Sequence, residues 1–139
     1  MKVEDCIFFQ LAKASRAGSG FWAKKVKHLG VTASQAMVLN FLGEEDCVPS
    51  HILSRKLQIT SATMTGILDR LEKMDLIERR PHHDDRRAIL VCLSSQGLTH
   101  AKEINTIMIT ANDAFLSELG PDQSQKFREF LKHVWMERS

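Results

Sequence analysis

The sequence predicts a mainly α-helical fold with a small β-wing: a winged helix-turn-helix whose N- and C-terminal helices form a dimerisation region. Three observations support this fold class. Apolar side chains recur at helical spacing after residue 59, two β-type runs then enclose a turn at residues 81–85, and apolar helical stripes mark both ends of the chain. A short helix, a tight turn, a longer helix and a charged hairpin, in this order, are the parts of a winged helix.

The N-terminal part begins with a helix expected over residues 5 to about 28. Its apolar positions lie on or near one side and are Ile7, Leu11, Ala14, Phe21 and Val26. Thr32 and Gln35 have the spacing of a capping box, in which each residue bonds the other's backbone N–H. This pair predicts that a second helix starts there and continues through Leu42.

The next two helices are expected to form the helix-turn-helix. Pro49 and Ser50 give the start signal of a short helix that ends at Leu57. Thr60 is expected to cap the following helix, which runs to about Met74. The apolar residues of that helix have the i, i+3, i+4, i+7 spacing of a buried face and are Met64, Ile67, Leu68 and Leu71.

The opposite face of this helix is small and polar, and it carries the first candidate DNA-binding residues: Ser61, Thr63, Thr65, Gly66, Arg70 and Lys73. Short hydroxyl side chains at the leading end can reach base edges, and the helix N-terminus favours a phosphate. The glycine allows a close backbone approach, and the two cations further along are expected to hold the sugar-phosphate backbone. Apolar residues at helical spacing form the core in most proteins, so it is the order of the elements that favours DNA.

The hairpin that follows consists of LIERR, the turn PHHDD and the run RRAILVCL. Residues 78–87 contain four arginines and three acids, and residues 24–27 hold a second basic group. An arginine-rich turn by itself is usually a solvated loop. Directly after a helix-turn-helix it indicates a wing that contacts DNA.

Three segments, LGVTASQAMVLNFL, TMTGILDRLEKMDLIERR and DDRRAILVCLSSQG, resemble successive blocks of the MarR family of bacterial transcriptional regulators. The resemblance covers nearly the whole chain, and Asp85 and Arg87 match the family's Asp-x-Arg pattern in the wing. Asp75 departs from it, since family members usually have glycine there; aspartate tolerates the left-handed conformation of a helix end, though less well.

Within this winged-helix interpretation, the wing residues can be given roles. Arg87 is expected to enter the minor groove or to lie on its rim. Asp85, two residues earlier, is expected to fix the Arg87 guanidinium through a bidentate pair. Arg86 either adds a phosphate contact or is simply solvated.

The terminal segments predict a homodimer. The stripes that end in Phe115 and Trp135 give two long apolar helix faces, and a single small winged-helix unit has too little surface to cover both. We therefore expect one domain over residues 1–139, with a DNA-binding lobe at about 32–94 and dimerisation helices at about 1–29 and 95–139. The alternative is an intramolecular three-helix cluster. A twofold dimer would read an inverted repeat with half-sites about 34 Å apart.

Composition and motifs exclude several other classes. At 139 residues the chain is too short for a catalytic domain beside a DNA-binding one, and no catalytic motif, phosphate loop or paired carboxylates stand out, so we expect no enzyme and no cofactor. His82 and His83 lack further metal ligands nearby, so no metal is expected. The longest apolar run, AILVCL, has six residues, and the N-terminus lacks a signal peptide, so we expect a cytoplasmic protein without a membrane partner.

The three cysteines show no CxxC spacing, and their odd number predicts neither a disulfide framework nor a zinc site. Cys92 lies in an apolar strand and is interpreted as inert packing, and Cys47 follows three acids that oppose its ionisation. Cys6 is the candidate redox residue, because some MarR relatives sense organic hydroperoxides through a cysteine near the start of the first helix. Those relatives place tyrosines against the thiol and this chain has none, so a small packing residue is the favoured interpretation.

The sequence thus predicts a homodimeric transcriptional regulator, a repressor that binds double-stranded DNA and is released by an effector. The resemblance implies that such an effector is often a small aromatic or phenolic acid bound between the dimer helices and the DNA-binding lobe. Two alternatives remain open: a thiol-based oxidant sensor on the same scaffold, and a dimeric protein-binding adaptor whose basic wing meets an acidic partner.

Overall fold

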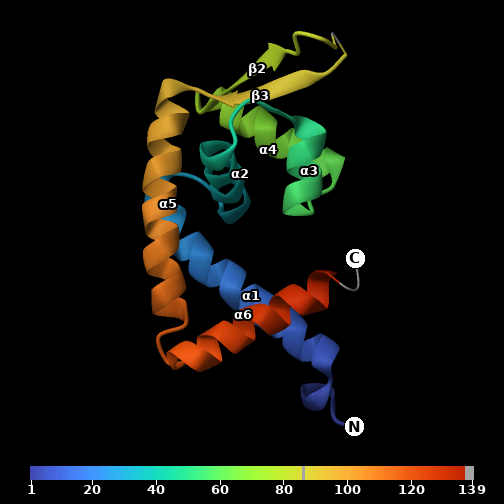
Figure 1. The fold of residues 1–139 in the computed structure, drawn as a ribbon, viewed down its shortest axis with the longest axis vertical. Coiled ribbons are helices and arrows are strands. Elements are labelled where there is room, and N and C mark those ends of the chain that lie inside the picture. The colour runs from blue at the N-terminus through green and yellow to red at the C-terminus, as the bar shows by residue number, and fades with distance from the viewer. Residues whose placement is uncertain (86, 137–139) are drawn as a thin grey trace. The chain divides into compact units, whose positions relative to one another are not determined.

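A computed structural model describes residues 1–85 and 87–136 and divides the chain into two compact units, Met1–Ile107 and the part from Met108 onward (Figure 1). The first unit contains, in chain order, the 3-10 turn η1 (Val3–Asp5), α1 (Ile7–Val26), η2 (Lys27–Leu29), α2 (Ala33–Glu44), β1 (Val48–Pro49), α3 (Ser50–Leu57), α4 (Ser61–Lys73), β2 (Ile77–Pro81) and β3 (Ile89–Leu93). Helix α5 (Ser95–Phe115) begins in the first unit and ends in the second, which also holds α6 (Pro121–Met136). The predicted fold class, mainly α with a small β-wing, is confirmed.

The helix starts follow the predicted caps. Thr32 Oγ1 accepts a hydrogen bond from the Gln35 backbone N–H at 3.2 Å, and Gln35 Oε1 accepts one from the Thr32 N–H at 2.9 Å. At the start of α4, Thr60 Oγ1 accepts from the Thr63 N–H at 3.3 Å. Asp75, just past the end of α4, has φ 56° and so adopts the left-handed conformation that glycine usually supplies.

The three strands form one antiparallel sheet in the order β1-β3-β2. Val48 pairs with Val91, and Ile77 pairs with Leu93 at the base of the β2–β3 hairpin. The hairpin extends away from the helices (Figure 1). The sequence did not predict β1, because a two-residue strand that ends in proline leaves no alternating pattern.

The core of the first unit lies among α2, α3, α4 and the sheet. Its fully buried large side chains include Leu39, Leu42, Leu53, Met64, Leu71, Leu76, Ile77, Val91 and Ile104. Helix α1 joins this core through Val26 and through Trp22, whose Nε1 donates to the Ala33 carbonyl at 3.2 Å. None of the described helices is long and apolar enough to cross a membrane.

The second unit shows the predicted apolar stripe of α6, and most of it is exposed. Phe127 and Leu131 are each 39% exposed, Trp135 is 52% exposed and Phe130 is 58% exposed. Arg128 Nη1 donates to Asn112 Oδ1 at 3.4 Å, which ties α6 to the end of α5 within this unit. Large side chains left in water to this extent are available for association.

Gly97 lets the start of α5 pack directly on the backbone before β2. A Cβ added at this position would lie 1.8 Å from the carbonyl oxygen of Leu76. Ser94 fixes the same junction, since its N–H donates to that carbonyl at 3.1 Å and its hydroxyl donates to the Asp75 carbonyl at 2.6 Å. The Ser94 hydroxyl also accepts from the Gly97 N–H at 2.9 Å and so caps α5.

Replacement of Gly97 by alanine should therefore destabilise the protein by about 1 to 3 kcal/mol or more, because backbone must move to admit the methyl group. Gly66 is the matched control: it also lies in a helix, but an added Cβ there meets nothing within 4 Å. Gly66→Ala should raise stability by about 0.5 to 1 kcal/mol. Urea unfolding of both variants measures these changes, and a Gly97→Ala protein as stable as the original chain would contradict the packing argument.

Candidate nucleic-acid interface

Helix α4 is oriented by its buried stripe. Met64, Leu68 and Leu71 are at most 2% exposed, so this side of the helix faces the core. The opposite side faces outward, and all six residues that the sequence selected there are exposed: Ser61, Thr63, Thr65, Gly66, Arg70 and Lys73. The structure thus leaves all six open to a partner on the part of α4 that is not buried.

The hydroxyl groups at the leading end of α4 already make local hydrogen bonds. The Thr60 hydroxyl donates to Thr63 Oγ1 at 2.9 Å, and the Thr65 hydroxyl donates to the Ser61 carbonyl at 2.9 Å. These bonds use one acceptor site of Thr63 and the proton of Thr65. Thr63 can therefore donate outward and Thr65 can accept, which gives the surface both kinds of group that base edges require.

Arg79 ties the wing to α4, a contact that the sequence analysis missed. From β2 its guanidinium donates to Asp69 Oδ1 at 2.7 Å and to Glu72 Oε2, both on α4. Partial burial acts to lower the pKa of Arg79, but the hydrogen bonds to these carboxylates outweigh it and the net shift is upward. The sequence did contain a signal for this contact: two acids three residues apart on the helix, followed by an arginine-rich strand.

The tip of the wing is closed by backbone hydrogen bonds. The His82 N–H donates to the Ala88 carbonyl, and the Ala88 N–H donates to the Asp85 carbonyl, both at 3.0 Å. Arg80 is held along the strand by Glu78, with Nη2 to Oε2 at 2.8 Å. Neither Arg80 nor Arg79 therefore presents an uncompensated charge.

The predicted pairing of Asp85 with the Arg87 guanidinium is wrong. Asp85 Oδ1 instead accepts from the Arg87 backbone N–H at 2.9 Å, and no ion pair joins the two side chains within the described part of the chain. An aspartate two residues before an N–H forms such a turn locally, without ordering a long side chain. The Arg87 side chain is exposed on the wing, and Arg86 lies outside the described residues.

The interpretation of Cys92 as an inert thiol, and the expectation that no disulfide forms, are also wrong. Cys47 and Cys92 are joined by a disulfide, while Cys6 is a free and partly exposed cysteine. The two cysteines meet because β1 and β3 are antiparallel neighbours. A rule based on the spacing of cysteines in short motifs does not consider such pairing between distant strands. Asp46 lies with the two sulfurs inside 4.8 Å, a group that could hold a metal, but the disulfide occupies both sulfurs.

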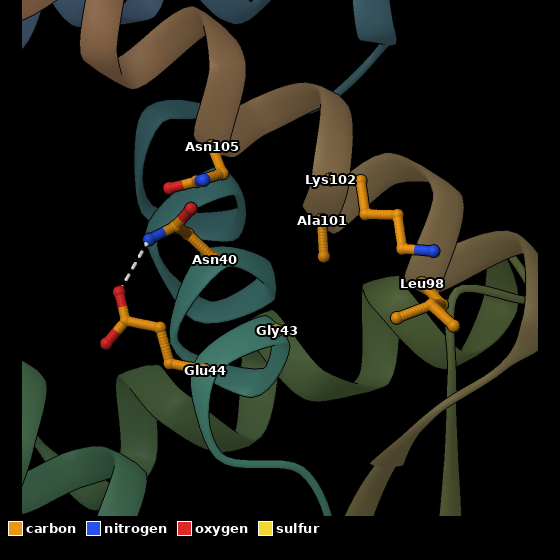
Figure 2. A pocket seen from close by; sticks show the side chains of 7 residues that line it. All are labelled: Asn40, Gly43, Glu44, Leu98, Ala101, Lys102 and Asn105. Carbon is orange, nitrogen blue, oxygen red and sulfur yellow. Dashed lines mark hydrogen bonds between the residues drawn. The ribbon is translucent and has the colours of Figure 1, made fainter.

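A pocket of about 160 Å³ lies between α2 and the first half of α5 (Figure 2). Asn40, Gly43 and Glu44 line it from α2, and Leu98, Ala101, Lys102 and Asn105 line it from α5. Asn40 Nδ2 donates to Glu44 Oε1 at 3.2 Å across one edge. The lining mixes polar and apolar groups and offers one cationic and one anionic side chain.

An outward polar helix face beside a basic hairpin defines a winged-helix protein, and comparisons with known proteins agree. Residues 31–89 match the model of the MarR family. The organic hydroperoxide resistance transcriptional regulator of Bacillus subtilis is 29% identical over 97 residues, which are 70% of this chain and 66%, just under two thirds, of that protein.

Solved structures share the fold over almost the full length. A probable transcriptional regulator from Pseudomonas aeruginosa has a TM-score of 0.89 and 28% identity, covering 96% of this chain and 99% of that one. The S. aureus MepR–DNA complex has a TM-score of 0.86 at 19% identity, covering 95% and 98%. The predicted resemblance to the MarR family is thus confirmed over residues 31–89, and the solved structures share the fold of the chain.

Proposed function

We propose that this chain is a sequence-specific DNA-binding transcriptional regulator that represses as a homodimer on an inverted-repeat operator. The observation that carries the proposal is the exposed part of α4, where six small or polar residues flank or lie opposite a buried stripe. A relative with the same fold is solved with DNA, which supports nucleic acid as the partner of this face. An acidic protein partner, the adaptor alternative, would require no groove-sized helix.

In this proposal α4 enters the major groove. Ser61, Thr63 and Thr65 are the residues that contact base edges, and Gly66 permits close approach of the helix backbone. Arg70 and Lys73, one to two turns further along, contact phosphates. Arg87 reaches the minor groove or its rim from the wing, where Arg86 adds a phosphate contact.

Charge is distributed to suit this arrangement although the formal net charge is only +2. Arg79 and Arg80 are paired with acids, so their contribution is local and structural. Among the described residues, the exposed cations of the proposed interface that make no ion pair are Arg70, Lys73 and Arg87. Affinity is therefore expected to depend on a few identifiable phosphate contacts and to fall steeply with salt.

The dimer is proposed to form through the terminal helices, about residues 1–29 and 95–139, leaving a DNA-binding lobe at about residues 32–94. Besides the α6 stripe, Phe8 on α1 is 73% exposed and Ile109 on α5 is 58% exposed. A second copy of the chain would cover such faces, and a twofold axis then relates the two α4 helices. An inverted-repeat operator, on which the bound dimer blocks transcription, follows from that symmetry.

An effector is proposed to bind between the lobe and the dimerisation helices, and the pocket between α2 and α5 is the candidate position. A small aromatic or phenolic acid would place its carboxylate near Lys102, the one cation of the lining. Bound there, it would release DNA by favouring a lobe position that does not fit two half-sites. A regulator of this kind acts in the cytoplasm, where bacterial DNA lies.

The DNA proposal is tested by binding to a duplex from the region upstream of the protein's own gene, across a range of salt concentrations. If about six phosphates are neutralised, log K should fall with log salt with a slope of about −5. Arg87→Ala should weaken binding by about 1 to 3 kcal/mol and make the slope shallower by roughly 2, because each dimer loses two contacts.

Arg80→Ala is the matched control, since Glu78 already holds that guanidinium on the same hairpin. Its effect on affinity and on the salt slope should be clearly smaller. Unchanged affinity of the Arg87→Ala protein would remove the wing from the mechanism.

The dimer is tested by analytical ultracentrifugation at low micromolar concentration. The unmodified chain should sediment as a dimer, and Phe130→Glu should shift it to monomer, because a buried unpaired carboxylate costs several kcal/mol. Lys132→Gln, a change of exposed charge on the same helix, should leave the dimer intact. A well-folded monomer of the unmodified chain would contradict both the dimer and the inverted-repeat operator.

A further inference from the structure

Cys47 and Cys92 face each other across the β1–β3 ladder. Val48 pairs with Val91, so the next position outward in this antiparallel register places residue 47 opposite residue 92. Their Cα atoms are 4.1 Å apart, the close approach of a directly opposed pair that lacks ladder hydrogen bonds. The sheet itself therefore brings the two sulfurs together, whether or not they are bonded.

Asp46 holds the same junction without any sulfur chemistry. Its Oδ1 accepts from the backbone N–H of Cys47 and from that of Leu93, both at 2.8 Å. One carboxylate thus bridges the loop before β1 to the end of β3. This bridge keeps the cysteines opposed after reduction, so that the bond can form again.

The two sulfurs differ in access. The Cys92 side chain is buried, with 1% of the residue exposed, while Cys47 is partly exposed on the loop. A solvent-borne oxidant or reductant can therefore reach the pair at Cys47, and Cys92 is the thiol that completes the bond. Cys6 belongs to the start of α1 and has no cysteine partner among the described residues.

The disulfide closes a chain segment that contains the proposed DNA-reading elements. The cysteines are 45 positions apart, and α3, α4, β2 and the wing all lie between them. Every candidate DNA-binding residue is inside this loop. Covalent closure restricts the unfolded lobe far more than the folded one, because the folded lobe already holds the two ends together.

We propose that Cys47 and Cys92 form a reversible dithiol–disulfide couple, oxidised by hydroperoxides, that fastens the DNA-binding lobe in its folded form. A disulfide in a bacterial cytoplasm is ordinarily transient or redox-sensing, because cellular thiols reduce it. The thiol chemistry is inferred only from the position of the two opposed cysteines. Its consequence for DNA rests on the proposed function.

The reaction balances with a hydroperoxide as the oxidant. The three acids before Cys47 oppose its ionisation, so the reaction proceeds through the small thiolate fraction. That thiolate attacks the terminal oxygen, an S–O bond forms as the O–O bond breaks, and the alcohol leaves after taking a proton. The Cys92 sulfur, after losing its proton, attacks the Cys47 sulfur; the S–S bond forms, the S–O bond breaks and water leaves. Two thiols and one hydroperoxide give one disulfide, one alcohol and one water.

Oxidation is expected to leave the winged helix intact, since all strand pairs and helices of the first unit are present with the bond in place. The oxidised lobe should therefore retain operator binding. Near the melting temperature of the reduced protein it should bind about two- to tenfold more tightly, because closure raises the fraction of the lobe that is folded and able to bind. Oxidation would thus raise operator affinity, whereas in a sensor that releases its operator on oxidation the affinity falls.

The experiment uses the full chain, reduced and then treated with an equimolar amount of cumene hydroperoxide. The number of free thiols per chain, counted under denaturing conditions, should fall from three to one without any disulfide between chains. Dithiothreitol should restore it to three. Oxidation should raise the melting temperature by roughly 5 to 15 °C. Cys6→Ser should retain the shift, and Cys47→Ser and Cys92→Ser should each abolish it.

Operator affinity is measured on the same samples, near the melting temperature of the reduced protein, with the duplex used for Arg87→Ala. Tighter binding after oxidation, lost in Cys47→Ser, supports the full proposal, and release of the operator would overturn its functional part. A disulfide that involves Cys6, a link between chains, or thiols that resist the hydroperoxide would overturn the couple itself. If neither the reduced nor the oxidised protein binds the duplex, the proposed function fails. The thiol count and the melting temperature still test whether Cys47 and Cys92 form the reversible disulfide.

Discussion

The burial of one side of α4 is the constraint on which the rest of the arrangement depends. Met64, Leu68 and Leu71 are almost completely withdrawn from water, and each such side chain stabilises the lobe by about 1.5 to 3 kcal/mol. Rotation of the helix about its axis would expose them, so the rotational position of α4 is fixed. The small and polar residues around the rest of the helix are thereby kept exposed.

One link holds the wing against this helix, and a second holds the sheet to the loop before β1. Arg79 joins β2 to α4 through Asp69 and Glu72, and the Asp46 carboxylate joins the end of β3 to the loop before β1. Each link places a charged group where it has several hydrogen-bond partners. The hairpin is therefore held at both strands, at Arg79 and at Leu93.

The helices could be predicted from the sequence because their signals are local. Apolar spacing gave the faces, and the Thr32–Gln35 pair and Thr60 gave the starts. The αL conformation of Asp75 was likewise anticipated from residue type. What failed depends on contacts between distant residues: β1 is too short to show a pattern, and the Cys47–Cys92 pair exists only through the register of β1 on β3.

The candidate site, too, could be predicted only in part from the sequence. The outward residues of α4 could be chosen from helical periodicity, whereas the roles of the wing arginines could not be separated by charge alone. Arg79 and Arg80 are engaged by acids on α4 and on β2, and Asp85 bonds a backbone N–H where an ion pair was predicted. Which arginine faces outward is decided by strand geometry, and sequence composition does not contain that information.

The central claim is that the outer face of α4 is shaped for a partner rather than for the fold, and Gly66 tests it most directly. Nothing in the chain lies within 4 Å of the position that a Cβ would take there, so the fold does not require glycine. Operator affinity of the Gly66→Ala protein should fall by about 1 to 3 kcal/mol, because the methyl group stands between helix and groove. Affinity equal to that of the original chain would contradict the claim, since the α4 backbone would then not lie against DNA.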